Sequence, residues 1–383
     1  MRFAKAVGLT LSMVFLFFAV YFPQPAGATA YFARKYDTQC GTCHVIPPKL
    51  NRTGEQFLAN GYKFADGTVP ARKTLPFSVW ATWRGEVDQG RDRGRGFPNR
   101  VELIFSGPIG KSRASYFIEW LPVSQQRNAA NQRVQRHGRF EDLFVSLPVH
   151  RSFVTVGQFR PLTQVDVSRR LSLSEPLAFS TGVAGPPALS SRLTGLRTFS
   201  ASGRSPAVRF SHQWAGRRSS DGLQVMATVP FAGEFVIPLT AEVHRTQGFE
   251  FEARPKGVFL ESFYRRGLSS IGAHTFLGDG RRLFGLVAVG NRGPFFSTLA
   301  LVRARERTGQ TDTRVSWENE LIPLRWLAVG LRLDDRTGIN RPVAIIPHVN
   351  VMFPLTSYML RFTVEHRQQS ANRQWLLEIG TVF

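Results

Sequence analysis

The sequence predicts a mainly β chain, in which a transmembrane antiparallel β-barrel of about sixteen strands follows a small, partly helical N-terminal unit. Two observations carry this prediction. From residue 76 onward, segments of about ten residues alternate between apolar and polar side chains and are separated by Gly, Pro, Asn and Asp. Before residue 76 this pattern is absent, and the only two cysteines of the chain occur there. We therefore divide the chain into 1–30, 31–75 and 76–383.

Residues 1–30 have the pattern of a secretory signal peptide. Arg2 and Lys5 form a charged start, an apolar run follows, and small residues come next. Cleavage is expected after Ala28 or Ala30. The alternative is an uncleaved anchor, because the apolar run is nearly long enough to span a bilayer. No later segment is a run of about eighteen apolar residues, so we expect no transmembrane helix in the mature chain.

Cys40, Cys43 and His44 form a C-x-x-C-H motif, which is typical of c-type haem attachment. The two thiols would bond to one haem, and His44 would be the proximal ligand of its iron. A dithiol redox pair is the first alternative, but it expects a thioredoxin-like βαβ context that this sequence lacks. A zinc site is the second, but no fourth ligand stands at a suitable spacing. C-type haem is attached outside the cytoplasm, so this motif agrees with export.

The sixth ligand of the iron is not evident from the motif. Residues 29–75 contain no Met and no second His, the usual partners in cytochromes c. Lys49, Lys63 and water are candidates within the unit. His137 and His150 are candidates if the rest of the chain folds back, although the favoured interpretation is that both are ordinary loop and strand histidines.

The N-terminal unit is expected to contain one short helix from Thr53 to Ala59, with Asn60 and Gly61 as its C-terminal cap. Because so few residues cannot enclose a haem alone, we expect the unit to pack against a larger part of the chain. The apolar residues available to cover the haem are Leu50, Phe57 and Tyr62.

Period-two alternation runs through residues 76–383, with apolar side chains expected to face lipid and polar ones the lumen. The alternative is a large soluble β-sandwich, whose strands average about five or six residues. The length of the segments and the many Phe and Trp residues favour the barrel. Bacterial barrels have even strand numbers, so about fourteen or eighteen strands are the nearest alternatives. The candidate strands are 77–84, 99–106, 113–120, 139–148, 152–160, 206–215, 223–229, 235–244, 258–265, 282–290, 295–305, 313–321, 324–334, 342–353, 358–367 and 372–383.

Two further segments favour a barrel of the outer membrane. Trp375, Leu377, Ile379 and Phe383 share one face of the last strand, and a final aromatic resembles the recognition signal of outer-membrane barrels. Residues 154–162 resemble the strand and loop of phosphate-selective-type porins. The following segment, Thr163 to Ser205, resembles a constriction loop that folds inward; the alternative is an exposed loop.

The formal net charge is +22, and of the 49 basic residues 7 are Lys and 42 are Arg. Nucleic-acid binding is disfavoured, because the Arg residues are dispersed and no basic helix or known DNA module occurs. A basic pore lining and a surface that meets lipid phosphates fit better. General Arg usage of the host is the alternative.

Taken together, the chain resembles the fused monohaem cytochrome c–porins of outer membranes, best known from iron-oxidising bacteria. This resemblance implies a haem plug in or at the mouth of the barrel. It implies outer-sphere oxidation of extracellular Fe(II), an iron(II):cytochrome oxidoreductase type of reaction, with electrons passed to a periplasmic carrier.

Two alternative functions stay open: an anion-selective porin with an accessory haem, and a conduit for another extracellular donor or acceptor. The resemblance assigns no residue of this sequence to binding of the Fe(II) substrate. The resemblance is specific in Phe32, Ala33, Arg34, the C-x-x-C-H motif, Pro48, Leu50, Gly54, Phe57, Gly61 and Tyr62.

Overall fold

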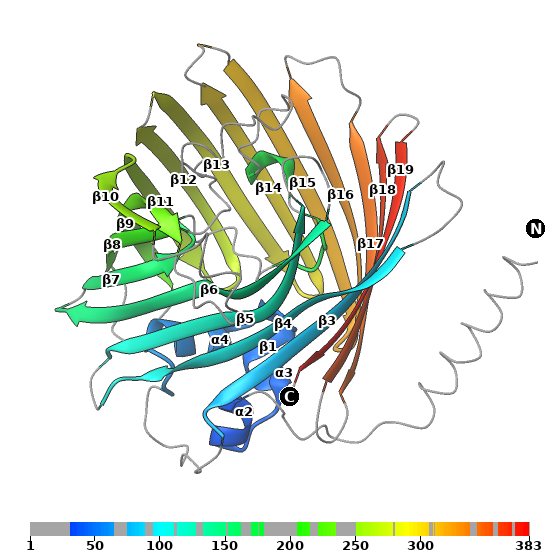
Figure 1. Ribbon diagram of the computed structural model, residues 1–383, viewed down its shortest axis with the longest axis horizontal. Coiled ribbons are helices and arrows are strands. Elements are labelled where there is room, and N and C mark those ends of the chain that lie inside the picture. The colour runs from blue at the N-terminus through cyan, green and yellow to red at the C-terminus, as the bar shows by residue number, and fades with distance from the viewer. Residues whose placement is uncertain are drawn as a thin grey trace, which may run out of the picture.

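The structure is a computed structural model, in which a closed antiparallel β-barrel holds a small N-terminal unit at one end (Figure 1). The predicted signal peptide, residues 1–30, lies outside the described residues, so its prediction stays open. The structure describes residues 31–64, 75–88, 95–110, 113–127, 133–150, 152–161, 170–174, 176–179, 205–214, 221–234, 250–278, 280–305, 309, 311–337, 343–354, 359–369 and 372–382.

The barrel has sixteen strand positions, as the sequence predicts. Seventeen strand segments build it, but β10 and β11 both pair with β9 and therefore share one position. The last strand pairs with the first, which closes the barrel. The strands are β3 (Phe77–Asp88), β4 (Arg95–Pro108), β5 (Ser115–Arg127), β6 (Arg133–Val149), β7 (Ser152–Phe159), β8 (Ser205–Trp214), β9 (Gly222–Glu234), β10 (Glu250–Pro255), β11 (Val258–Arg266), β12 (Ser269–Gly278), β13 (Arg281–Arg292), β14 (Phe295–Arg305), β15 (Thr311–Leu324), β16 (Leu327–Thr337), β17 (Ala344–Pro354), β18 (Met359–Gln369) and β19 (Asn372–Val382).

The strand predictions need correction at three places. Neither β10 nor β12 was predicted, and in β12 the small residues Ser270 and Gly272 weaken the alternation on the luminal face. The candidate 324–334 began too early, because Leu324 ends β15 and a tight turn precedes β16. The candidate 235–244 lies outside the described residues.

The side chains of the barrel are arranged with the apolar face outward. In β15, Trp317 and Leu321 are 46% and 45% exposed, whereas Arg314, Glu318 and Glu320 are almost completely buried inside. β11 alternates strictly between exposed and buried residues. A soluble protein buries its apolar side chains instead, so this arrangement is that of a wall with lipid outside and a polar lumen inside.

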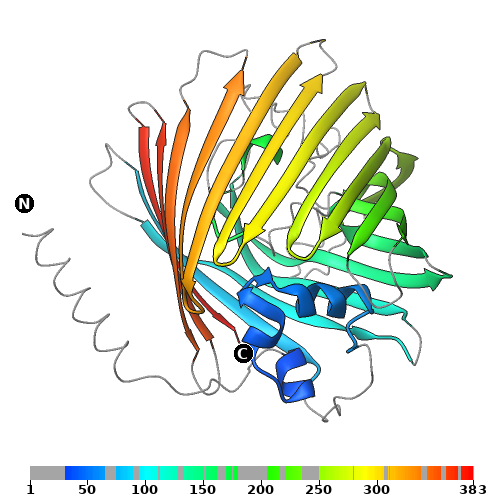
Figure 2. The same ribbon diagram turned by 180° about the vertical axis from the view of Figure 1, so that it is seen from behind.

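The N-terminal unit lies across the end of the barrel where the C-terminus and the start of β3 also lie (Figures 1 and 2). In bacterial barrels of this kind the short turns are periplasmic. The unit contains α2 (Tyr31–Tyr36), α3 (Cys40–Cys43), β1 (His44–Ile46), β2 (Lys49–Leu50) and α4 (Arg52–Ala59). Among the residues that the structure describes, no helix is both long and apolar enough to cross a membrane.

Aromatic side chains attach the unit to the barrel wall. Tyr36, Phe57 and Tyr62 form a buried cluster in the unit. Phe117 of β5 stacks on Tyr62 with ring centroids 6.1 Å apart. The unit therefore leans on the barrel, as its small size requires.

The described part of the connection between β7 and β8 folds into the lumen, as predicted for a constriction loop. The inward-folded part consists of residues 170–174 and 176–179, which we call the inward loop, and includes the short helix η2 (Leu177–Phe179). Leu171 is fully buried, and the backbone N–H of Ala178 donates to Ser316 of β15 at 3.0 Å.

Candidate functional site

The C-x-x-C-H motif spans α3 and the start of β1. Cys40 and Cys43 are not joined in a disulfide. His44 Nδ1 lies 3.1 Å from the carbonyl oxygen of Pro48. A carbonyl only accepts, so Nδ1 carries the proton and Nε2 keeps the lone pair that an iron ligand needs. The residues therefore fit a covalently attached haem, with the orientation of the histidine set by the backbone.

Burial shifts the pKa values of the motif toward the uncharged forms. It lowers the pKa of His44 to about 4, so the imidazole is neutral near pH 7. Burial, followed by the charge of Cys40, raises the pKa of Cys43 to about 11. A neutral imidazole is the form that binds iron.

Asn51 holds the motif in shape from the start of α4. Its backbone N–H donates to the carbonyl of Cys43 at 2.9 Å. Its side-chain amide donates to the carbonyls of Gly41 at 3.1 Å and Thr42 at 3.0 Å. Its side-chain oxygen accepts from the N–H of Gly54 at 3.0 Å and so caps the helix. One residue therefore fixes both the motif and the helix that follows.

Gly54 allows α4 to lie directly against the motif. A Cβ atom at this position would lie 2.2 Å from the carbonyl oxygen of Cys43 and 2.9 Å from Cδ2 of Leu50. No real Cβ approaches a backbone oxygen so closely. α4 begins at Arg52, one residue before the predicted start, and Asn60 caps it as predicted.

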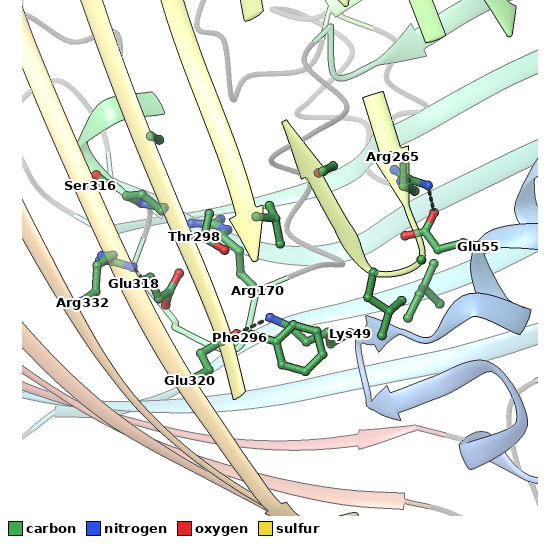
Figure 3. Close-up of a pocket in the computed structure, with 17 residues that line it drawn as sticks. Lys49, Glu55, Arg170, Arg265, Phe296, Thr298, Ser316, Glu318, Glu320 and Arg332 are labelled. Carbon is green, nitrogen blue, oxygen red and sulfur yellow. Dashed lines mark hydrogen bonds and ion pairs between the residues drawn. The ribbon is translucent and has the colours of Figure 1, made fainter. Parts of the chain in front are cut away.

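Ion pairs join the unit to the barrel (Figure 3). Lys49 pairs with Glu320 of β15, and its Nζ lies 4.4 Å above the ring centroid of Phe296. Glu55 of α4 pairs with Arg265 of β11 at 2.5 Å. Both pairs are buried, so each charge depends on its partner for compensation.

The four candidate residues for the sixth iron ligand lie at different places in the structure. The amine of Lys49 pairs with Glu320, and that of Lys63 donates to the carbonyl of Gly110 at 3.0 Å. His150 is exposed in the turn between β6 and β7. His137 belongs to β6, and its side chain lies outside the described part of the structure.

A chamber of about 70 Å³ separates the N-terminal unit from the inward loop and the barrel wall. Lys49 and Glu55 line it from the unit, Arg170 lines it from the loop, and Glu318 and Arg332 line it from the wall (Figure 3). A cavity of this size holds several water molecules.

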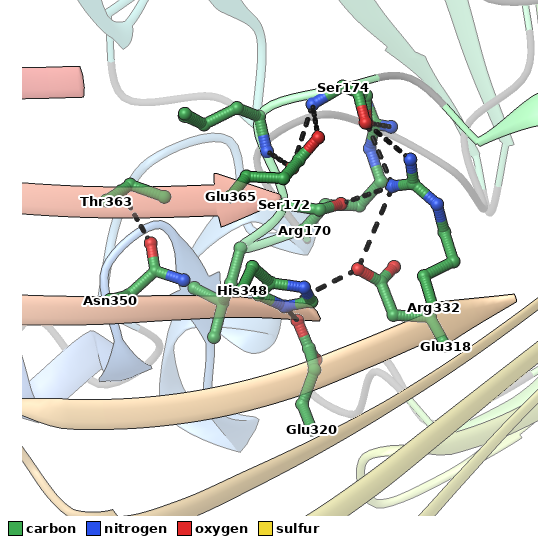
Figure 4. Close-up of polar contacts among 12 residues, drawn as sticks. Arg170, Ser172, Ser174, Glu318, Glu320, Arg332, His348, Asn350, Thr363 and Glu365 are labelled. Atoms are coloured by element: carbon green, nitrogen blue, oxygen red, sulfur yellow. Dashed lines mark hydrogen bonds and ion pairs between the residues drawn. The ribbon is translucent and has the colours of Figure 1, made fainter. Parts of the chain in front are cut away.

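The inward loop is tied to the wall by charged side chains (Figure 4). Glu365 of β18 accepts from the backbone N–H groups of Leu173 at 2.7 Å and Ser174 at 3.2 Å. Arg332 of β16 donates to the hydroxyl groups of Ser172 at 2.7 Å and Ser174 at 2.5 Å. The loop is therefore a fixed part of the lumen.

Several residues of this region were not predicted from the sequence. Asn51 and Gly54 contact the C-x-x-C-H motif only because α4 packs against it, and no local sequence pattern indicates this packing. Glu318 and Glu320 had a signal, because they alternate with apolar residues in a predicted strand. His348 of β17 also alternates with apolar residues in a predicted strand, but its position beside these two carboxylates depends on the strand register.

Comparison with solved structures identifies the fold of outer-membrane porins. An anion-selective porin from Comamonas acidovorans has a TM-score of 0.50 at 13% identity, covering 80% of this chain and 97% of that one. OccK2 (OpdF) of Pseudomonas aeruginosa, in complex with glucuronate, has a TM-score of 0.46 at 11% identity, covering 80% of this chain and 97% of that one. No protein-family model and no curated protein matches the sequence. The shared feature is therefore the porin-type barrel.

Proposed function

We propose that the chain is an outer-membrane electron-transfer protein that carries one haem c on Cys40 and Cys43, with His44 as proximal ligand. Its proposed donor is extracellular Fe(II), and its proposed acceptor is a periplasmic electron carrier. The observation that carries the proposal is the C-x-x-C-H motif, whose histidine is oriented by Pro48 and which is held at one end of a polar lumen.

The position of the unit suits this function. A closed barrel satisfies its own backbone hydrogen bonds in lipid. In this proposal a small soluble donor enters the polar lumen from the far end. The haem would supply a one-electron redox centre at its iron. The chain would hold the haem at the end that bears the short turns, where a periplasmic carrier could reach it. Outer-sphere transfer needs no general acid or base, so positioning is the main task of the protein.

An anion-selective porin with an accessory haem is the second candidate. The fold shared with a porin named as anion-selective favours it, as do the buried luminal arginines Arg314, Arg332 and Arg361. Against free passage of solutes stand the N-terminal unit and the inward loop. The paired contacts of Lys49 and Glu55 hold the unit across one end of the lumen. A conduit for a different extracellular electron donor or acceptor would use the same barrel and the same N-terminal unit with its proposed haem.

Two measurements on protein purified from outer membranes distinguish these functions. Haem absorbance that stays with the denatured chain, and is lost in Cys40→Ser and Cys43→Ser variants, supports the haem protein. Single-channel recording of the same sample then tests the porin. Low conductance supports electron transfer, whereas steady anion conductance with little haem would contradict the proposal.

A further inference from the structure

A buried histidine faces two carboxylates on the luminal wall (Figure 4). His348 Nε2 lies 3.7 Å from Glu318 Oε1 and 3.9 Å from Glu320 Oε1. The ligand atoms of all three side chains lie within 4.8 Å of one another. His348 is 2% exposed, and neither of its ring nitrogens has a hydrogen-bond partner among the described residues. A buried imidazole without such partners is costly, so its orientation toward the carboxylates needs an explanation.

Strand register and one glycine create this arrangement. Gly330 of β16 is paired with Glu320 on one side and with His348 on the other. A Cβ atom on Gly330 would lie 2.1 Å from His348 Nε2. The imidazole therefore lies over the glycine and reaches across β16 toward the carboxylates of β15. Any larger residue at position 330 would exclude it.

The charges around the carboxylates leave ligand atoms available. Lys49 pairs with Oε2 of Glu320, but Oε1, the atom that faces His348, has no hydrogen bond among the described residues. The same holds for Oε1 of Glu318. Arg332 lies 4.0 Å from Glu318 Oε1, but it is closer to Asp334, at 3.1 Å. Arg170 of the inward loop also lines the chamber beside Glu318, and both Oε1 atoms still have no hydrogen bond among the described residues.

We infer that Glu318, Glu320 and His348 form a binding site for a divalent first-row transition-metal ion. Such ions hold nitrogen and oxygen ligands at about 2.0–2.2 Å, which places ligand atoms about 3–4 Å apart. The observed separations need only a small closure. An imidazole with two carboxylates suits Fe(II), Mn(II) or Zn(II) better than Mg²⁺ or Ca²⁺. Glu318 and Glu320 line the chamber, which can supply water for the remaining positions.

The site adjoins the N-terminal unit through Lys49. This residue belongs to β2, which pairs with β1, the strand that begins with His44. A metal ion held by Glu320 would therefore lie next to a residue of the haem-binding unit. Identifying the ion as the Fe(II) substrate rests on the proposed function; the metal site itself does not.

A second acidic cluster in the lumen differs from the proposed metal site. Glu102, Glu119 and Glu141 also lie within 4.8 Å of one another. Arg100 pairs with Glu102 and also with Glu141, and the cluster contains no imidazole. An arginine already serves as its cation, so we assign no metal to it.

A glycine pair provides a matched test. Gly330→Ala would displace the ring of His348 while leaving all three ligands in the chain. Gly285→Ala would do the same to His274, another buried luminal histidine, because a Cβ there would lie 2.2 Å from its Nε2. The full-length protein is titrated with Mn(II) without oxygen, and free Mn(II) is followed by its electron paramagnetic resonance signal.

We expect one Mn(II) bound per chain. Affinity should fall about 10–100-fold in Gly330→Ala, as for other changes that misplace a metal ligand, and stay unchanged in Gly285→Ala. Glu318→Gln, which keeps the shape of the side chain, should also weaken binding. Absence of Mn(II) binding, or equal binding by both glycine variants, would overturn the inference. Mn(II) bound at these residues in a protein whose haem does not react with Fe(II) would support the site and refute the proposed function.

Discussion

Lys49 of the N-terminal unit and Glu320 of β15 form a buried ion pair, although 271 residues separate them in the chain. Lys49 stands one residue before Leu50, the register partner of His44. Glu320 belongs to the carboxylate and histidine group of the lumen. This contact connects the N-terminal unit with the luminal wall, so the docking of the unit on the barrel can be tested by mutation.

Lys49→Met should loosen the unit, because Glu320 would then be a buried charge without its partner. Breaking a buried pair from one side costs about 3–5 kcal/mol. We expect faster hydrogen exchange of the α4 amides and higher conductance. Lys35→Met is the control, since Lys35 lies over the rings of Tyr31 and Tyr36 within the unit. Recovery of slow exchange in a Lys49→Met/Glu320→Leu double variant would confirm the electrostatic cause, and unchanged exchange in Lys49→Met would refute it.

Gly54→Ala should displace α4 from the motif, because the added Cβ would lie 2.2 Å from the carbonyl oxygen of Cys43. We expect a large loss of covalent haem, measured as haem absorbance of the denatured chain relative to protein. Gly41→Ala lies within the motif but meets only Arg325 Nη1, at 3.9 Å, so it should retain haem. Equal haem content in the two variants would contradict the close packing of α4.

Asn51→Asp separates the two roles of Asn51. Aspartate keeps the oxygen that caps α4 but loses the amide that donates to Gly41 and Thr42. Asn51→Ala loses both, and loss of the cap alone costs about 1 kcal/mol. We expect hydrogen exchange of the α4 amides to be faster only in Asn51→Ala. A shifted haem reduction potential in both variants would show that the amide shapes the motif; an unchanged potential would contradict this.

The sequence could predict the barrel because alternation is local. Residues 313–321 show it directly, and the luminal direction of Glu318 and Glu320 follows from the period of two. It could not predict that His348 joins them, because this depends on register across three strands and on the missing side chain of Gly330. β12 was missed for a similar reason, since Gly272 contributes no side chain to the alternation. The C-x-x-C-H motif is readable in the sequence, but its support by Asn51 is a tertiary contact.

Glu365→Gln should release part of the inward loop. The carboxylate accepts from the backbone N–H groups of Leu173 and Ser174, and a neutral amide accepts more weakly. Loss of one charged hydrogen bond costs about 1.5–3 kcal/mol. Conductance noise and protease cleavage of the loop should both increase. Glu378→Gln is the matched control, because Glu378 pairs with Arg84 on the wall. Similar effects of both variants would contradict the anchoring role of Glu365.

Electron transfer from Fe(II) to the haem is tested most directly by rapid mixing of the oxidised, purified protein with Fe(II) without oxygen, followed by haem absorbance. We expect a covalent haem that is reduced rapidly and completely, and a His44→Ala variant in which this reaction is lost. A chain with no covalent haem, or with a haem that Fe(II) leaves oxidised, would contradict it.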